Sequence, residues 1–229
     1  MKNLINRIYH NKIAEALLHT VVYELKKELA GCESALDLGC GPDSPIQHCK
    51  NIEHSVGVEA YISYLDRSKN KKIHNEYINQ DIRTVNFEPN SFDAVIMIEV
   101  LEHLTKEDGI KMLERAEQWA RKKVIITTPN GFINQKPLDG NSLQKHLSGW
   151  ISQDFKNRRY RVRGLAGPKF LRKEAEHESM NDNITATIKR RPKILWFGVS
   201  ALSQILYYYL PSHAFELIAI KKGKDGRIT

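Results

Sequence analysis

One segment restricts the fold of this chain more than any other, namely Ala35-Leu-Asp-Leu-Gly-Cys-Gly-Pro-Asp-Ser-Pro45. Its apolar first half is typical of a short buried strand, and Ser44 with Pro45 is typical of the first turn of a helix. Between them, Gly39-Cys40-Gly41 allows a sharp turn and lets a ligand approach the backbone with no Cβ in the way. In an open α/β sheet, ligands bind beside the carboxyl end of such a strand. The segment therefore predicts a strand, a loop and a helix around a bound small molecule.

Short apolar runs alternate with helical stretches along most of the chain. Strand–helix alternation of this kind is typical of an α/β fold: a doubly wound, mostly parallel sheet with helices on both faces. The predicted strands are residues 34–38, 54–59, 72–79, 92–98, 123–128, 160–165 and 214–220. The predicted helices are residues 44–50, 60–67, 105–121, 151–159 and 194–210.

The chain divides into four predicted parts. Apolar residues recur every four positions from Ile13 to Leu29, which is typical of an amphipathic helix. The parts are an N-terminal helix packed on the domain (1–30), a ligand-binding core (31–171), a polar flexible insertion or lid (172–193), and a covering helix with the last strand of the same domain (194–229).

Acidic residues lie at or just after the ends of three successive predicted strands: Asp37, Glu59 and Asp81. Glu59 can accept hydrogen bonds from ribose hydroxyls, and Asp81 from an adenine amino group. A nicotinamide dinucleotide fits less well, because Asp43 occupies the third glycine position and Asp37 repels phosphate. S-adenosylmethionine (SAM) carries a sulfonium and an ammonium group and no phosphate. These acids therefore favour SAM, and a nicotinamide dehydrogenase is the alternative.

The chain resembles class I SAM-dependent methyltransferases, in particular the small type 11 and ubiquinone-pathway group. The resemblance lies in Leu36-Asp-Leu-Gly-Cys-Gly41, Glu59, Asp81, Phe92–Leu104 and Val124–Asn130, in that order. It covers about 31–131 well and 140–170 more loosely. It implies a Rossmann-like sheet of seven strands in which one strand, residues 214–221, is antiparallel.

The same resemblance implies which residues bind SAM and, after the transfer, its product S-adenosylhomocysteine. They are Asp37, Gly39, Cys40, Gly41, Glu59, Ala60, Asp81, Ile82, Ile98 and Glu99.

The candidate catalytic residues are Glu102, His103 and His146. With Glu99, the first two form an E-x-x-E-H stretch similar to that of ubiquinone-pathway O-methyltransferases and of small-RNA 2′-O-methyltransferases. Either these side chains brace the loop and orient the site, or they hold a divalent metal that organises the hydroxyls of an acceptor. The same stretch occurs in methyltransferases with no known metal, so no metal is assigned. Trp150 either lies near the methyl group or is a core residue.

Charge is unevenly distributed along the chain. Residues 1–100 hold 11 basic and 14 acidic residues, whereas 101–229 hold 24 and 13, and 155–173 has eight basic residues and no acid. We expect a small-molecule acceptor that can be anionic. The alternatives are RNA, a catalytically silent SAM-binding regulatory protein, and an acceptor at a membrane surface touched by 194–210.

Cys32, Cys40 and Cys49 suggest neither a disulfide framework nor a zinc site, and the first residues lack the apolar run of a signal peptide. We therefore expect a cytoplasmic protein. The acceptor and the oligomeric state stay open.

Overall fold

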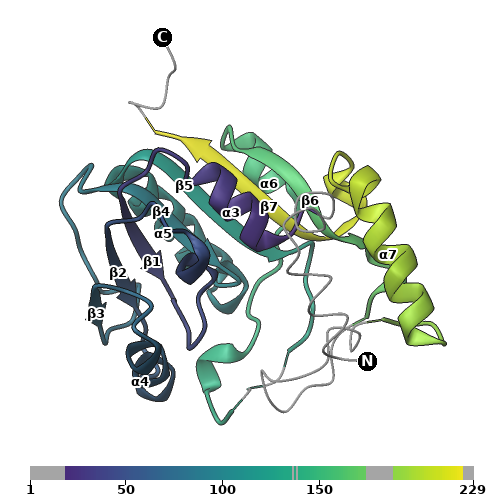
Figure 1. Ribbon diagram of the computed structural model, residues 1–229, viewed down its shortest axis with the longest axis horizontal. Coiled ribbons are helices and arrows are strands. Elements are labelled where there is room, and N and C mark those ends of the chain that lie inside the picture. The colour runs from purple at the N-terminus through teal and green to yellow at the C-terminus, as the bar shows by residue number, and fades with distance from the viewer. Residues whose placement is uncertain (1–18, 136, 138, 174–187, 224–229) are drawn as a thin grey trace.

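The computed structural model describes residues 19–135, 137, 139–173 and 188–223. They form a seven-stranded sheet in the order β3-β2-β1-β4-β5-β7-β6 (Figure 1). Its strands are β1 (Ser34–Leu38), β2 (His54–Val58), β3 (Glu76–Ile78), β4 (Phe92–Ile98), β5 (Ala120–Pro129), β6 (Arg161–Pro168) and β7 (Ala214–Lys222). Only β7 runs against its neighbours β5 and β6. The expected α/β sheet with one antiparallel strand at 214–221 is thereby confirmed.

The two halves of the sheet meet between β1 and β4. β1 pairs in parallel with β2 on one side and with β4 on the other. After β3 the chain returns across β1 to form β4. The connection that leaves β1 therefore runs toward one edge of the sheet, and the connection that leaves β4 runs toward the other edge. Such a switch point leaves a crevice at the carboxyl ends of the two strands, which is where open α/β sheets bind ligands.

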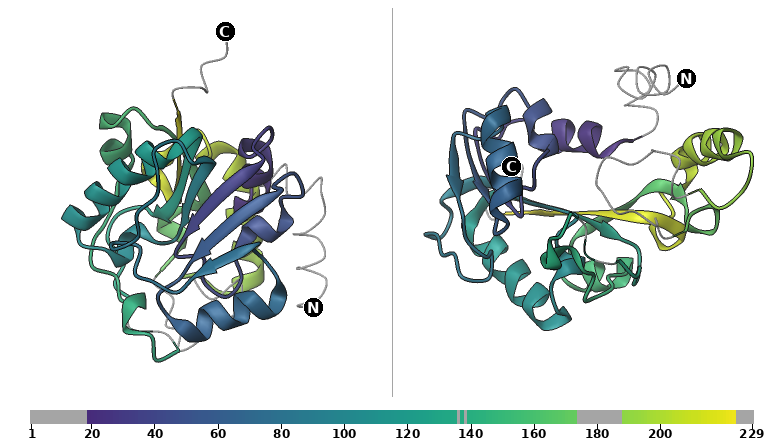
Figure 2. Two further views of the ribbon diagram at one scale, coloured as in Figure 1. Left: turned by 90° about the vertical axis from the view of Figure 1, so that its left-hand side faces the viewer. Right: turned by 90° about the horizontal axis from the view of Figure 1, so that it is seen from below.

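Helices cover both faces of the sheet, and two separate apolar cores lie beneath them (Figure 2). Buried residues of α5 (Lys106–Trp119) and α6 (Ser152–Asn157) pack into one core. Buried residues of α3 (Val21–Glu28), together with Tyr208 just after α7 (Lys193–Tyr207), pack into the other. α4 (Ile62–Lys71) follows β2.

Some expected boundaries change in the structure. The helix expected at 44–50 is only a 3₁₀ turn, η1 (Pro45–His48). The helix expected at 105–121 begins as predicted, with the Thr105 side chain accepting from the N–H of Asp108, but ends at Trp119. Ala120 is already extended and starts β5, so no separate turn joins helix to strand.

A single helix running to residue 29 is wrong. α3 begins at Val21, because Thr20 has an extended backbone and caps the helix by accepting from the N–H of Tyr23 at 3.1 Å. His19 has a φ of +45°, which breaks a continuous helix. Residues 1–18, most of the insertion expected at 172–193, and 224–229 lie outside the described residues.

One buried carboxylate ties three strands together. Asp93 is 3% exposed and accepts from the N–H of Glu33 at 2.8 Å, from Arg121 Nη2 at 2.9 Å and from Lys122 Nζ at 3.0 Å. Burial alone would raise the pKa of Asp93, but these three donors outweigh it and hold the pKa below its ordinary value. The ionised carboxylate therefore stabilises the junction of β1, β4 and β5.

The substitution Asp93→Asn should lower the free energy of unfolding at pH 7 by about 1–3 kcal/mol, because it removes charge-assisted hydrogen bonds from a buried group. A depressed pKa stabilises the fold above the unfolded-state pKa, and that stability is lost as the pH falls through the folded-state pKa. The difference from the wild type should therefore shrink below about pH 4. Urea unfolding of the wild type and the variant, at pH 7 and below about pH 4, measures this difference in stability.

The matched control is Asp66→Asn, which changes an exposed carboxylate on α4 and should leave the stability unchanged. Equal stability of Asp93→Asn and the wild type at pH 7 would contradict the role given to Asp93.

Candidate functional site

The glycine loop follows β1 and is held against β2. The N–H groups of Gly39 and Cys40 donate to the carbonyl of Val58 at 2.8 and 3.0 Å. Gly39 and Gly41 have φ values of +70° and +58°, which residues with a Cβ rarely adopt. A Cβ at Gly39 would also lie 2.8 Å from a methyl carbon of Val100. Glycine at 39 is therefore required both by the turn and by the packing.

Glu59 lies directly after β2 and faces the loop. It is 8% exposed, and its two oxygens accept from the N–H groups of Gly41 at 3.1 Å and Tyr61 at 2.8 Å. Burial raises the pKa of Glu59 in spite of these donors. Each carboxylate oxygen can accept a second hydrogen bond, so both ribose hydroxyls can still bind there.

Asp81 follows β3 and is already engaged by a neighbour. Arg83 donates from Nη2 to Asp81 Oδ2 at 2.6 Å and from Nε to Oδ1 at 3.0 Å. The hydrogen bonds from Arg83 hold the pKa of Asp81 below its ordinary value. Ile82 lies beside it with 7% of its surface exposed. An adenine amino group at Asp81 would have to share the carboxylate with Arg83.

Asp37 is a buried carboxyl group near the end of β1. It is 1% exposed, and Ser44 donates to its Oδ2 at 2.5 Å. Burial raises the pKa of Asp37 to about 7, and the nearby Glu59 adds to the rise. His74 Nε2 lies 3.5 Å from Oδ2, but burial lowers the pKa of His74 to about 4. His74 is therefore uncharged at pH 7 and does not neutralise Asp37.

These side chains line two adjoining hollows at the carboxyl edge of the sheet. The smaller has a volume of about 150 Å³ and includes Asp81 and Ile82. The larger has a volume of about 400 Å³ and includes Asp37 and the glycine loop. All the residues predicted to bind SAM line one or both hollows: Asp37, Gly39, Cys40, Gly41, Glu59, Ala60, Asp81, Ile82, Ile98 and Glu99.

Glu99 directly follows β4 and has an unusual backbone. Its φ is +55°, and its N–H donates to the carbonyl of Thr127 at 3.1 Å. Non-glycine residues in this region cost free energy and cluster at functional sites. The side chain remains open to the solvent in the cleft, and desolvation by the cleft walls raises its pKa to about 7. This places an ionisable carboxyl group at the boundary of the two hollows.

Glu102 lies deeper in the larger hollow. It is 2% exposed, and Thr128 Oγ1 donates to its Oε2 at 2.9 Å. Burial raises the pKa of Glu102 well above its ordinary value, and the neighbouring Glu99 and Glu216 raise it further. This crowding of carboxyl groups favours either a bound proton or a bound cation.

Two imidazoles face Glu102. The rings of His103 and His146 have centroids 4.8 Å apart in an edge-on arrangement. Nδ1 of His103 lies 3.3 Å from the carbonyl of Lys145, and Nδ1 of His146 lies 2.6 Å from that of Ile133. A neutral imidazole that donates from Nδ1 keeps a lone pair at Nε2. Burial, and then His146, lowers the pKa of His103 to about 4, so this ring is neutral at pH 7.

The loop that carries His146 is fastened to the short helix η2 (Leu101–His103). The N–H groups of Leu147 and Ser148 donate to the carbonyl of Glu102 at 2.7 and 3.1 Å. Gln144 in this loop lines both hollows. The three candidate catalytic residues are therefore held as one unit, which reaches from the smaller hollow into the larger.

Trp150 belongs to the core and not to the site. It is 1% exposed, and its Nε1 donates to the carbonyl of Leu101 at 3.2 Å. It stacks on Phe155 and lies against Gly109, where a Cβ would collide with the indole. Of the two interpretations of Trp150, the core residue is correct.

Glu102, His103 and His146 could also hold a metal ion. One ligand atom from each lies within 4.8 Å of the other two. A carboxylate oxygen with two imidazole nitrogens suits several divalent cations. The same set could instead take a proton from an acceptor hydroxyl, since a neutral imidazole has a lone pair that can accept it.

Two residues in or beside the site went unrecognised in the sequence. Phe215 lines the larger hollow from the start of β7. Glu216 follows it and lines a separate hollow beside α7, and burial together with Glu99 raises its pKa well above the ordinary value. The available signal was an acid within the otherwise apolar run Ala214–Ile220.

Residues 36–128 match the family model of a methyltransferase domain. Among curated proteins, no sequence matches the chain. The solved structures that it is similar to include magnesium protoporphyrin IX methyltransferase from Synechocystis with SAM bound, at 13% identity and a TM-score of 0.52, covering 97% of this chain and 90% of that one. Another is the plantazolicin methyltransferase BpumL with S-adenosylhomocysteine, at 12% identity and a TM-score of 0.52, with the same coverage of 97% and 90%.

The chain spans only 57% of a Pyrococcus horikoshii protein that it matches at 20% identity over 53% of its own length, with a TM-score of 0.45. The two structures with a TM-score of 0.52 show a shared fold. The family match over residues 36–128, together with the seven-stranded fold and the hollow beside its glycine loop, shows that the chain contains a methyltransferase domain.

Proposed function

We propose that the protein methylates a hydroxyl group of a small-molecule acceptor, which binds at the cluster of Glu102, His103 and His146. The observation that carries this proposal is the position of the cluster. It shares the larger hollow with Asp37, the glycine loop and Glu99. Methyl transfer is an in-line displacement, so the acceptor must lie beside the sulfonium.

The chemistry of the cluster favours an oxygen nucleophile. A hydroxyl group must lose its proton as it attacks, and a neutral imidazole with its lone pair at Nε2 can accept that proton. His103 is uncharged at pH 7, because its pKa is lowered to about 4. In this proposal His146 receives the proton, His103 and Glu102 orient the acceptor, and the acidic surroundings keep any anionic group of the acceptor outside the cluster.

The pairing of the basic segment 155–173 supports a small molecule rather than RNA. Arg161 donates to Glu28 at 2.6 Å, and Arg158 to Glu114 at 3.1 Å. Lys169 donates to the carbonyl of Asn130, and Arg172 to that of Ala166 at 3.0 Å. Much of this charge is therefore used within the protein, whereas RNA binding relies on cations directed at phosphates.

The test uses SAM with a labelled methyl group, offered with a panel of hydroxyl-bearing metabolites and, separately, with RNA. We expect label in a small molecule, with equimolar formation of S-adenosylhomocysteine. The substitution His146→Asn should then lower kcat by roughly 100-fold, because it removes a proton acceptor, and should leave SAM affinity unchanged. Labelling of RNA alone would contradict the proposal.

The matched control is His213→Asn, which changes an exposed histidine outside the cleft and should keep full activity.

Adding a chelator distinguishes the two possible roles of the cluster, proton transfer and metal binding. Unchanged activity assigns the imidazoles to proton transfer, whereas a loss restored by Mg²⁺ or Mn²⁺ assigns them to metal binding.

SAM should bind more tightly as the pH rises from 6 to 8. The pKa of buried Asp37 is raised to about 7, and the positive sulfonium favours the ionised carboxylate, so binding releases a proton. One such group gives a change in Kd of about tenfold across this range. Calorimetric titration at both pH values measures it.

S-adenosylhomocysteine serves as the control ligand, since it has the same shape and lacks the sulfonium charge. Its affinity should vary less with pH, and Asp37→Asn should flatten the SAM profile. An equal pH dependence for both ligands would show that the sulfonium does not act on Asp37.

A further inference from the structure

Helix α7 turns polar side chains toward the protein. Ser200 and Gln204 are 0% and 3% exposed. The Gln204 side chain donates to the carbonyl of Gly164 at 2.9 Å and accepts from the N–H of Gly167 at 2.6 Å. A Cβ at either glycine would collide with α7 or the residues around it, so the helix lies tightly against β6. Its attachment therefore depends in large part on hydrogen bonds.

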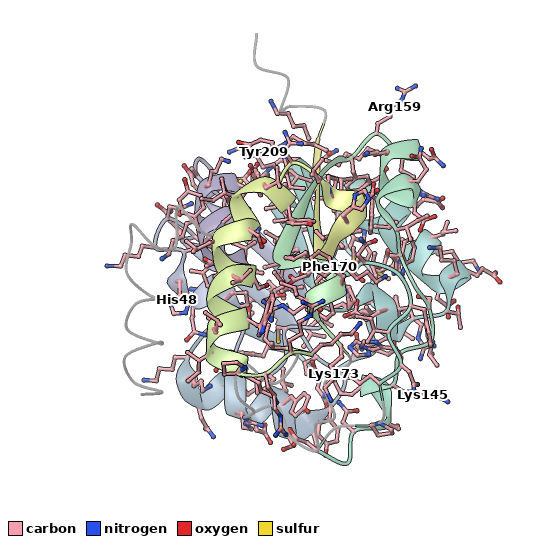
Figure 3. All side chains as sticks on the ribbon, turned by 90° about the vertical axis from the view of Figure 1, so that its right-hand side faces the viewer. His48, Lys145, Arg159, Phe170, Lys173 and Tyr209 are labelled. Carbon is pink, nitrogen blue, oxygen red and sulfur yellow. The ribbon has the colours of Figure 1, made fainter. Side chains whose placement is uncertain are left out.

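The opposite side of α7 is aliphatic and faces solvent. Figure 3 looks onto this helix, with Tyr209 at one end and Phe170 beside it. A helix on the surface of a globular domain normally shows the reverse pattern, with its apolar stripe buried. The stripe consists of Leu195 (60% exposed), Val199 (40%), Leu202 (73%), Leu206 (60%) and Tyr209 (62%), with Ile194, Ile205 and Leu210 on its flanks.

The charged residues within the sequence segment that carries this stripe are all basic. Residues 188–215 contain no aspartate or glutamate. Lys189, Arg190 and Arg191 just before the helix, and Lys193 as its first residue, are all exposed. The segment is therefore an apolar surface with a basic end.

Cations also lie over aromatic rings at both ends of the helix. The guanidinium of Arg190 lies 4.7 Å from the ring centre of Trp196, and that of Arg163 lies 5.6 Å from Tyr209. Aromatic side chains with basic neighbours are typical of the boundary between water and lipid.

We propose that α7 docks the enzyme on an anionic lipid bilayer, lying in the plane of the interface with its aliphatic stripe among the acyl chains. Aliphatic residues bordered by lysine and arginine are the composition of interfacial helices. The proposal does not require α7 to cross the bilayer, and the helix is only about 22 Å long. Among the described residues, no helix is long and apolar enough to do so.

Charge also decides between a bilayer and a second copy of this chain. A second copy that docked through the same segment would supply no acidic partner for these cations, because 188–215 holds none. Anionic headgroups supply that partner. This inference concerns binding alone, so its test is independent of the methyl acceptor.

The first experiment is flotation of the full chain with vesicles. We expect it to float with vesicles of phosphatidylcholine and phosphatidylglycerol, to float much less with phosphatidylcholine alone, and to detach as salt is added. No flotation with the anionic vesicles at low salt, or equal flotation with both kinds, would overturn the proposal.

Two variants then test the residues. Leu202→Ser with Leu206→Ser should weaken partitioning roughly tenfold or more, because it removes the most exposed side chains of the stripe. Replacing Lys189, Arg191 and Lys193 with Gln should weaken it by a similar factor for anionic vesicles only. Thermal melting confirms that both variants fold.

Each variant has a matched control. Ile62 and Ile151 are each 50% exposed and lie outside α7, so changing both to Ser removes similar apolar surface. Replacing the exposed Lys50, Lys69 and Lys156 with Gln removes the same charge. Both controls should float like the wild type, and equal effects of a control and its α7 variant would overturn the proposal.

Trp196 reports the position of the helix directly. The other two tryptophans, Trp119 and Trp150, are 2% and 1% exposed. Lipids that carry a quencher in the acyl chains should therefore quench Trp196, and the effect should vanish in Trp196→Phe. A dimer that Leu202→Ser with Leu206→Ser converts to a monomer, with no quenching in the wild type, would assign the stripe to self-association and overturn the proposal.

Discussion

The parallel pairing of β1 with both β2 and β4 is the constraint on which the rest of the structure depends. It aligns Asp37 with Gly57 on one side and with Ile96 on the other, so the three strands end at nearly the same level. This alignment places the residues predicted to bind SAM. The glycine loop turns over the end of β1, Glu59 directly follows β2, and Glu99 directly follows β4. These groups are fixed by main-chain hydrogen bonds, so they would need little rearrangement to bind SAM.

Of the described residues, those that line the larger hollow include several carboxyl groups and no lysine or arginine. Asp37, Glu99 and Glu102 all have raised pKa values, chiefly through desolvation. A pocket of this kind favours a cationic ligand, because the positive charge of the ligand lowers the pKa of the carboxyl groups and they then ionise more readily. The strained backbone of Glu99 belongs to the same arrangement, because it brings the side chain to the boundary between the two hollows.

The fold and the cofactor side could be predicted from the sequence because their signals are local. The strand, the glycines and the cap of η1 are neighbours in the chain, and the acids follow strands whose order is dictated by alternation. The acceptor side could not be predicted in the same way. Glu216 comes from β7, far along the chain, and only the antiparallel pairing with β5 brings it near Glu99. The apolar composition of α7 likewise indicated a covering helix, whereas its hydrogen bonds to β6 turn that stripe outward.

The fastening of the 142–148 loop to η2 also links the two hollows. Leu143 and Lys145 border the smaller hollow, His146 borders the larger, and Gln144 borders both. One short segment is therefore a wall common to the two hollows. A ligand that moved this segment on entering one hollow would change the shape of the other, so the two binding events would be coupled.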